Sequence, residues 1–417
     1  MNISEIINHE KVIIKYQPIM STHNKNFLGL EALVRGLDND IEISPMELFQ
    51  EARNNHLVLS LDKLCIKKSI KGFQDFFHFN QKSILFINID ATVMNYYINS
   101  DYIETLLKES HIKTSNIVLE INELKTISLK KMKDFSVKYK KLGCLIALDD
   151  VGAGESNLER IPLIMPDIMK IDKNLIQDLG KSFYCKQVVA SIIELASNLG
   201  ALVVIEGVET AKDINHVAAF GAHLIQGYYL GKPSLLSTEF FISIFENKTK
   251  ITELIYQYNK VIHHERKKNH NYMNLIANEM KSKIELITLN KYKKLILETI
   301  CKYDVVESVY ILNMEGKLLT DTIFNEDVAL NVNDLLYTPC LENDTVELAE
   351  YFTKIKYGGY DFWISNEYIS MASGHKCYTY SSSFKKDMNT TYIICIDFDS
   401  HKTSQKLTHY NKEVNYE

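Results

Sequence analysis

The stretch "CLIALDDVGAGESNL" (Cys144–Leu158) ends an apolar run with two adjacent acids, Asp149 and Asp150, and continues into a glycine-rich turn. Two neighbouring carboxylates repel each other, and both lose hydration if they are buried. Either the pair lies in a solvated loop, or it faces a multivalent cation at the end of a strand. A lone pair of acids favours the loop, so the choice depends on whether the pattern repeats elsewhere in the chain.

The first 245 or so residues alternate short apolar runs with longer amphipathic stretches. The apolar runs are VIIKYQPI, LGLEALVRG, ILFINID, NIVLEINE, CLIALDD, IMKID, ALVVIEGVE and LIQGYYLG. The helix-like segments between them are Glu47–Phe77, Ile103–Ser110, Leu129–Leu142, Cys185–Leu199 and Lys212–Phe220. Strands that alternate with helices favour a parallel sheet, and this number of strands predicts a TIM-type (β/α)₈ barrel. An open doubly wound sheet is the alternative, but its glycine-rich fingerprint does not follow the first strand.

Composition limits the classes of partner. With 417 residues, 46% hydrophobic and 24% charged, the chain is typical of a globular protein with more than one domain. A net charge of -6 provides no general attraction to nucleic acid polymers or acidic membranes. The seven cysteines contain no C-x-x-C pair, which argues against a zinc site or a disulfide framework. No apolar run approaches the roughly 18–20 residues that cross a bilayer, so we expect a cytoplasmic protein.

The remainder of the chain changes character. Residues 234–315 contain neither glycine nor proline, and apolar residues recur at helical spacing from Ile251 to Ile262. We expect a long amphipathic helix there, whose apolar stripe suggests a homodimer. Short alternating runs follow, as in a small antiparallel sheet with turns at Gly316 and Gly374. The expected domains are a barrel (1–245), a helical linker (246–290), an α+β domain (291–405) and a polar tail (406–417).

The acid pattern does repeat at the ends of the barrel runs. The residues at these ends are Glu31, Asn88, Glu120, Asp149 with Asp150, Lys170 and Glu206. The carboxyl ends of barrel strands form the reaction face of such enzymes. Oxygen ligands without cysteine or histidine suit Mg²⁺ or Mn²⁺. Adjacent acids can serve two ions, with one carboxylate bridging, so the repeated pattern favours a cation site over a solvated loop.

Lys170 lies among apolar residues, where an unpaired ammonium group is costly. It shares a strand face with Asp172, so a structural ion pair with that residue or another acid at the barrel mouth is one interpretation. The other is a fixed positive charge that holds a nucleophilic water or stabilises charge at phosphorus. The sequence leaves both open.

Residues 5–245 resemble the EAL-domain cyclic-di-GMP phosphodiesterases. The name-giving triplet stands as Glu31-Ala32-Leu33, with Arg35 at the expected offset. The other motifs follow in family order as YQPI, INID, LEINE, LDDVGAGESNL, KIDK, IEGVET and QGYYLGKP. The resemblance implies a barrel whose first strand is antiparallel, with a hairpin around "STHNKNFLG", and hydrolysis of cyclic-di-GMP to linear pGpG.

The same resemblance implies roles for individual residues. It implies one ion held by Glu31, Asn88, Glu120 and Asp149, with Asp149 bridging to a second ion held by Asp150. Lys170 and Glu206 match the residues that orient or deprotonate the attacking water, and Glu123 matches the acid that pins the loop after Asp150. The residues that match ligand contacts or supporting positions are Gln17, Leu33, Arg35, Asp172, Glu209 and Gln226.

Three departures from the family pattern support an alternative function. Gly36, Val151 and Asn122 replace a tryptophan, a phenylalanine and a threonine, and none of them is a metal ligand. A cyclic-di-GMP receptor that does not hydrolyse its ligand is therefore the second hypothesis, and an enzyme for another phosphodiester is the third. The C-terminal region resembles PAS- or Cache-like sensory domains that bind a small ligand, although a dimerisation module would also fit it.

Overall fold

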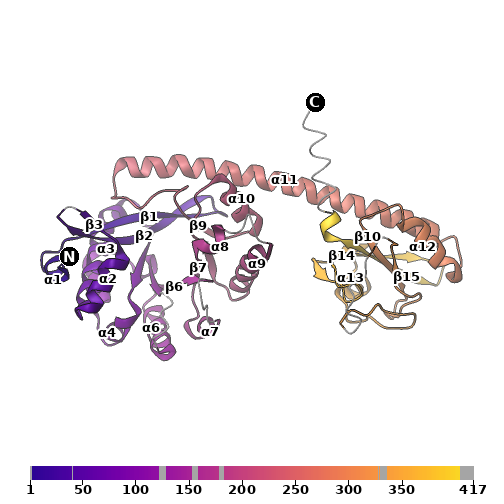
Figure 1. Ribbon diagram of the computed structural model, residues 1–417, viewed down its shortest axis with the longest axis horizontal. Coiled ribbons are helices and arrows are strands. Elements are labelled where there is room, and N and C mark those ends of the chain that lie inside the picture. Colours follow the sequence, from indigo (N-terminus) through magenta and orange to yellow (C-terminus); the bar gives the residue numbers. More distant parts are fainter. Residues whose placement is uncertain are drawn as a thin grey trace. The chain divides into compact units, whose positions relative to one another are not determined.

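The computed structural model describes residues 2–39, 41–121, 128–152, 158–177, 183–326, 328 and 336–403. The chain divides into two compact units, Met1–Lys260 and Val261–Glu417. Helix α11 (Thr238–Ile284) contributes residues to both units. Figure 1 shows both units, with many of their elements labelled.

The first unit is a closed eight-stranded barrel. Strand β1 pairs antiparallel with both β2 and β9, and all other neighbours in the ring are parallel. This confirms the predicted barrel with an antiparallel first strand and excludes the open sheet, while β3 (Ile41–Ile43) only extends the edge of β2. The barrel strands are β1 (Val12–Ser21), β2 (Asn26–Asp38), β4 (Ile84–Ile89), β5 (Ile117–Ile121), β6 (Leu145–Val151), β7 (Ile168–Ile171), β8 (Leu202–Ile205) and β9 (Leu224–Gln226).

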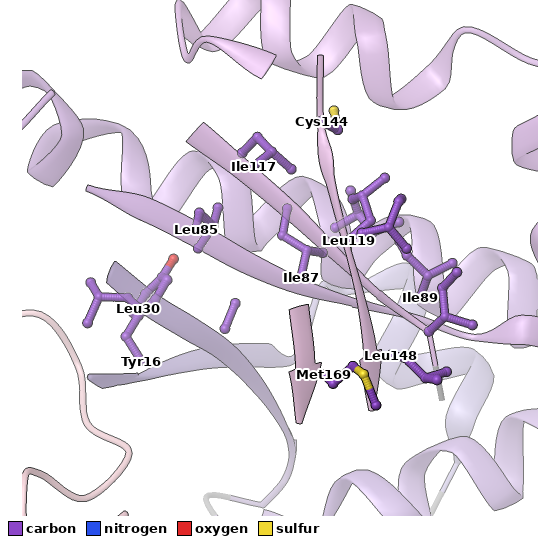
Figure 2. Close-up of a cluster of buried hydrophobic side chains, with 14 of the residues drawn as sticks. Tyr16, Leu30, Leu85, Ile87, Ile89, Ile117, Leu119, Cys144, Leu148 and Met169 are labelled. Carbon is purple, nitrogen blue, oxygen red and sulfur yellow. The ribbon is translucent and has the colours of Figure 1, made fainter. Parts of the chain in front are cut away.

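The two faces of each strand belong to two separate apolar cores. Outward residues such as Leu85, Ile87 and Leu119 pack against the surrounding helices, as Figure 2 shows. The inward residues fill the barrel, and they are Ile19, Phe86, Val118, Ala147, Ile168, Val204 and Leu224. Because side chains alternate along a strand, a continuous apolar run supplies both cores. These inward residues form a packed layer across the barrel interior, called the apolar plug below, and the mouth of the barrel lies directly above it.

Most of the predicted helices are present. The structure has α5 (Tyr102–Ser110), α6 (Leu129–Lys141), α9 (Phe183–Asn198) and α10 (Ala211–Phe220) where the sequence predicts them. The single helix expected over Glu47–Phe77 is wrong, because α2 (Pro45–Asn54) and α3 (Val58–Phe79) are separate. The chain turns between them at His56, whose φ of 57° is left-handed. Shorter helices are α1 (Ile3–Asn8), α4 (Met94–Ile98), α7 (Arg160–Ile164) and α8 (Lys173–Gln177).

The second unit is built on an antiparallel sheet in the order β11-β10-β15-β14-β12, with β13 paired to β14. One face packs against α11 and α12 (Tyr292–Ile300), and the other packs against α13 (Glu350–Gly358). The hairpin at Gly374 is confirmed, but the turn at Gly316 is followed only by an isolated bridge between Leu312 and Leu318. The strands are β10 (Val306–Leu312), β11 (Ile323–Phe324), β12 (Phe362–Ile364), β13 (Tyr368–Ile369), β14 (Lys376–Lys385) and β15 (Thr391–Asp399).

Helix α11 uses part of its apolar stripe within the first unit. Ile251 and Ile255 are buried in the outer core of the barrel, and Leu254 packs against that core. These side chains are therefore not free to cover a second copy, and the dimer predicted from them stays a prediction. No helix among the described residues is long and apolar enough to cross a membrane.

Candidate functional site

The polar residues of the barrel mouth lie one layer above the apolar plug. A spacing of two residues puts two side chains on the same face of a strand. The plug residues of six strands are each followed two positions later by a polar residue. These polar residues are Asn88, Glu120, Asp149, Lys170, Glu206 and Gln226. On β2, Glu31 lies opposite Gln17 of the antiparallel β1, so both of those strands also supply a side chain to this layer.

The adjacent acids of β6 meet the same site because the strand is irregular there. The register between β6 and β7 shifts between Leu148 and Val151, and Asp150 has a φ of 55°. In a regular strand Asp150 would point away from Asp149, towards the helices. Instead, carboxylate oxygens of Asp149, Asp150 and Glu206 lie within 4.8 Å of one another. The pair therefore belongs to the barrel mouth, in agreement with the cation interpretation.

Lys170 lies at the centre of the acidic residues and is 1% exposed. Its Nζ is 2.7 Å from Glu206 Oε1, 3.0 Å from Glu120 Oε1, 3.4 Å from Glu31 Oε2 and 3.5 Å from Asp149 Oδ1. Burial alone would lower the pKa of Lys170, but these four carboxylates raise it well above its ordinary value. The ammonium group is thus charged and paired with acids of the barrel mouth.

Hydrogen bonds fix Glu31 between three strands. Asn88 Nδ2 donates to Glu31 Oε1 at 2.9 Å, and Gln226 Nε2 donates to Glu31 Oε2 at 2.5 Å. Gln226 also donates to Gln17 Oε1 at 3.0 Å, and Gln17 donates to the carbonyl of Gly231 at 3.2 Å. The carboxylate of Glu31 is therefore held rigidly at the seam where the barrel closes.

The pKa values of the acids differ because their partners differ. Burial works to raise the pKa of Glu31, but Lys170 and the amide donors Gln226 and Asn88 hold it below its ordinary value. For Glu120, burial and the charge of Glu31 raise the pKa well above its ordinary value, although the charge of Lys170 acts in the opposite direction. The site thus holds more acidic groups than its own donors can satisfy.

The acids nearest the opening have raised pKa values as well. Burial raises the pKa of Glu206 to about 7, and burial and Asp149 raise that of Asp150 to about 6. Glu120 Oε1 and Asp149 Oδ1 are buried and accept no hydrogen bond, although both face Lys170. Four carboxylates thus share the ammonium group of Lys170, and Asp150 adds a fifth acid beside them, an excess of acidic groups that bound cations would balance. The donor set is oxygen only and therefore fits a hard divalent ion such as Mg²⁺, Mn²⁺ or Ca²⁺.

A cavity of about 400 Å³ adjoins these acids. Glu31, Asn88 and Asp149 line it together with Leu33, which the sequence analysis assigned to ligand contact. Helices α2 and α3 form another part of the wall, and their polar contributions include Gln50, Arg53, Asp62 and Ser69. Arg53 and Asp62 carry no signal in the sequence pattern, because only the tertiary packing of α2 and α3 brings them here.

Four other predicted residues lie outside this acidic cluster or outside the described residues. The guanidinium of Arg35 donates to the carbonyl of its neighbour Val34 at 2.7 Å. Asp172 accepts the N–H of Asn174 at 2.8 Å at the start of α8. Glu209 is exposed, and its own N–H donates to Asp213 at 3.1 Å. Glu123 lies outside the described residues, as does Asn122.

The departure at Gly36 has a structural counterpart. A Cβ atom on Gly36 would lie 2.9 Å from Leu48 Cδ1 and 3.3 Å from Ile43 Cβ. The space beside this position is therefore already filled by α2 and β3, and a larger side chain does not fit without movement. Val151, the second departure, is 2% exposed and packs in the outer core.

Comparison with known proteins adds to this geometry. The sequence of residues 2–233 matches the model of the EAL domain family. The chain belongs to the EAL domain family. The match covers more than half of the chain and the whole of the acidic site described above.

The match to one relative extends beyond the barrel. The chain is 28% identical over 340 residues to the uncharacterised EAL-domain protein YkuI of Bacillus subtilis, which covers 77% of this chain and 79% of YkuI. It is 28% identical over 231 residues to PdeB of Escherichia coli, a probable cyclic di-GMP phosphodiesterase, but spans only 44% of that protein. A crystal structure of YkuI in complex with c-di-GMP and calcium matches with a TM-score of 0.78 at 22% identity, covering 96% of this chain and 99% of that chain. That likeness shows a shared fold.

Proposed function

We propose that this protein hydrolyses cyclic-di-GMP to linear pGpG with the help of two Mg²⁺ or Mn²⁺ ions. The observation that carries the proposal is the group of four carboxylates around Lys170, with Asp150 beside them, which opens into a cavity large enough for part of a dinucleotide. Membership of the EAL family supports the choice of substrate, because matched relatives include proteins described as cyclic di-GMP phosphodiesterases.

The oxygen ligands divide naturally between two ions. We assign Glu31, Asn88, Glu120 and Asp149 to the first, and Asp149 with Asp150 to the second. When bound, the ions would add positive charge beside the phosphodiester and lower the pKa of the attacking water. The fixed hydrogen bonds to Glu31 support the first assignment, because a ligand that is already oriented loses little entropy on binding.

Glu206 and Lys170 have separate roles in the reaction that we propose. Glu206 has a pKa raised to about 7, so its carboxylate can accept the proton of the attacking water near neutral pH. Lys170 lies 2.7 Å from Glu206 Oε1 and keeps that carboxylate oriented. The water oxygen bonds to phosphorus in line with the 3′-oxygen, whose bond to phosphorus breaks, and the 3′-oxygen gains a proton from solvent.

The second unit is proposed to regulate this activity in response to a small ligand. Helix α11 supports the idea because it supplies buried residues to both units, Ile251 and Ile255 in the first and Ile276 and Met280 in the second. A change in the packing of the C-terminal half of α11 can therefore be transmitted along the continuous helix to the barrel. Turnover that is unchanged by Ile276→Ala, in a chain that remains folded, would argue against this regulation.

A turnover assay tests the proposed function directly. Purified full-length protein is incubated with cyclic-di-GMP and Mn²⁺ or Mg²⁺, and pGpG is separated by chromatography. We expect turnover in the parent chain and its loss in Glu31→Ala and Glu206→Gln. Glu109→Ala, on the exposed face of α5, is the matched control. Binding without product in either metal would favour the receptor hypothesis, and equal turnover in Glu31→Ala would contradict the metal assignment.

A further inference from the structure

Helix α2 turns one continuous face towards the cavity. Met46, Phe49, Gln50 and Arg53 all line it, at the i, i+3, i+4, i+7 spacing of a single helix face. The other side of α2 contributes Leu48 and Ala52 to the outer core, and both are fully buried. Met46 is 80% exposed, so an apolar side chain is left in water at the edge of the cavity. Phe49 also packs against the outer core from the cavity side, whereas Met46, Gln50 and Arg53 turn towards the cavity and are available to a ligand.

Arg53 is the cationic group of this face. Its only partner among the described residues is Asp90, at 3.5 Å between Nη2 and Oδ2. A guanidinium carries five N–H donors in a planar fork, so most of them remain available. Asp90 is itself anchored, because its N–H donates to the buried carboxylate of Asp62 at 3.1 Å, which also accepts the Tyr97 hydroxyl at 2.6 Å. Asp90, the partner of Arg53, is thus held in place by Asp62.

The position of Arg53 relative to the metal ligands suggests what it contacts. Asp90 follows the proposed metal ligand Asn88 by two residues, which is about 6–7 Å along an extended chain. Around it the cavity wall is formed largely by apolar side chains, namely Leu33, Phe49, Ile87 and Ala91. Apolar side chains beside a planar cation suit a nucleobase better than a phosphate group.

We infer that Arg53 reads the Hoogsteen edge of a guanine base, donating two hydrogen bonds to O6 and N7. This inference rests on the proposed function, since it assumes that a cyclic dinucleotide lies with its phosphate at the metal ligands. A bidentate arginine is the commonest specific contact to guanine in protein complexes with nucleic acids. Adenine presents an amino group where guanine has O6, and arginine cannot accept a hydrogen bond from it. Arg53 is then a specificity-determining residue.

Steady-state kinetics with matched substrates test the inference. The substrates are cyclic-di-GMP and its 7-deazaguanine analogue, which lacks the N7 acceptor. We expect Arg53→Ala to raise KM for cyclic-di-GMP roughly 5–150-fold while kcat changes little, as for the loss of one bidentate pair. The analogue is expected to lose affinity for the parent enzyme but to show a much smaller additional loss with Arg53→Ala. Lys67→Ala, which removes an exposed cation of α3 paired with Glu10, is the control.

A third variant separates a base contact from a phosphate contact. Arg53→Lys keeps the positive charge but loses the fork, so we expect its KM to stay close to that of Arg53→Ala. Full recovery by lysine would overturn the inference, because charge alone would then suffice. An unchanged KM in Arg53→Ala, with an active parent enzyme, would overturn it as well and leave the proposed function intact. A parent enzyme without turnover or binding of cyclic-di-GMP would overturn both.

Discussion

At the barrel mouth four carboxylates share the ammonium group of Lys170, whereas in the second unit the buried carboxylate of Asp397 accepts hydrogen bonds from hydroxyl groups. Asp397 is 2% exposed and accepts from Ser308 Oγ at 2.8 Å and Thr379 Oγ1 at 2.7 Å. Each of its oxygens has a neutral partner that is fixed to a neighbouring strand. At the mouth, by contrast, buried oxygens of Glu120 and Asp149 accept no hydrogen bond.

The difference separates two uses of a buried acid. A carboxylate whose two oxygens both accept hydrogen bonds from neutral donors of the same sheet is a structural element, because its burial is already compensated within the sheet. A group of carboxylates with too few donors is costly unless something else supplies positive charge. On this criterion the barrel mouth has the charge balance of a binding site, whereas the Asp397 network is part of a core.

Replacing Lys170 should produce the largest effect on stability. Lys170→Met leaves four facing carboxylates without their cation, and breaking a buried ion pair in this way costs about 3–5 kcal/mol. We expect urea denaturation at pH 8 without metal to show this loss of unfolding free energy. The loss should be smaller at pH 5, where some of the carboxylates are protonated. A loss below 1 kcal/mol at pH 8 would mean that the acids are not charged together.

Asp397→Asn should change the pH dependence of the second unit. Burial raises the pKa of Asp397 to about 6 in the folded chain, from an ordinary value of 3.8. The folded state therefore binds the proton more tightly, and this residue makes stability fall by roughly 3 kcal/mol as pH rises from about 4 to about 6. The asparagine variant should lack this fall and be more stable than the parent at pH 8. If the free energies of unfolding of the parent and of Asp397→Asn change in parallel with pH over this range, the raised pKa of Asp397 is contradicted.

Metal should stabilise the first unit and leave the second unit unaffected. Mn²⁺ at a hundredfold excess over its dissociation constant adds about 2.7 kcal/mol to a protein that binds it only when folded. We expect this gain for the parent chain and for Asp397→Asn, measured by thermal unfolding at pH 7.5. The gain should disappear in Glu31→Ala and on addition of EDTA. A gain retained in Glu31→Ala would place the ion elsewhere.

Ser308→Ala should have the smallest effect of the four. It removes one neutral donor from Asp397 and costs about 1 kcal/mol, the usual value of one hydrogen bond. Turnover and the response to Mn²⁺ should remain at the level of the parent chain. A change in either would mean that the Asp397 network communicates with the barrel mouth and is more than a core element.

Much of the site is predictable because the strand period fixes it. A polar residue two positions after an inward-facing apolar residue lies on the same face of the strand, at the mouth of the barrel. Asn88, Glu120 and Lys170 can be found in this way. The position of Asp150 could not be derived from this period, since a regular strand would send it to the opposite face. Only the irregularity of β6, with Asp150 in the left-handed region, brings it to the mouth.

Elements that depend on tertiary packing were harder to predict. The helical pattern runs through residues 54–57 without a glycine or proline, so the break at His56 has no clear sequence signal. Arg53 could have been suspected only after α2 was separated from α3 and its cavity-facing side identified. At Gly316 the turn is real, with a φ of 84°, but the residues after it pair only briefly with β10.

The seam between the first and last strands also has a consequence for biosynthesis. Glu31 takes a hydrogen bond from Gln226, which is made 195 residues later. A ribosome must therefore deliver nearly the whole barrel before that carboxylate acquires its final orientation. Contacts so distant along the chain close late in folding. Nascent or prematurely terminated chains would thus contain the motif that names the family without a completed acidic centre.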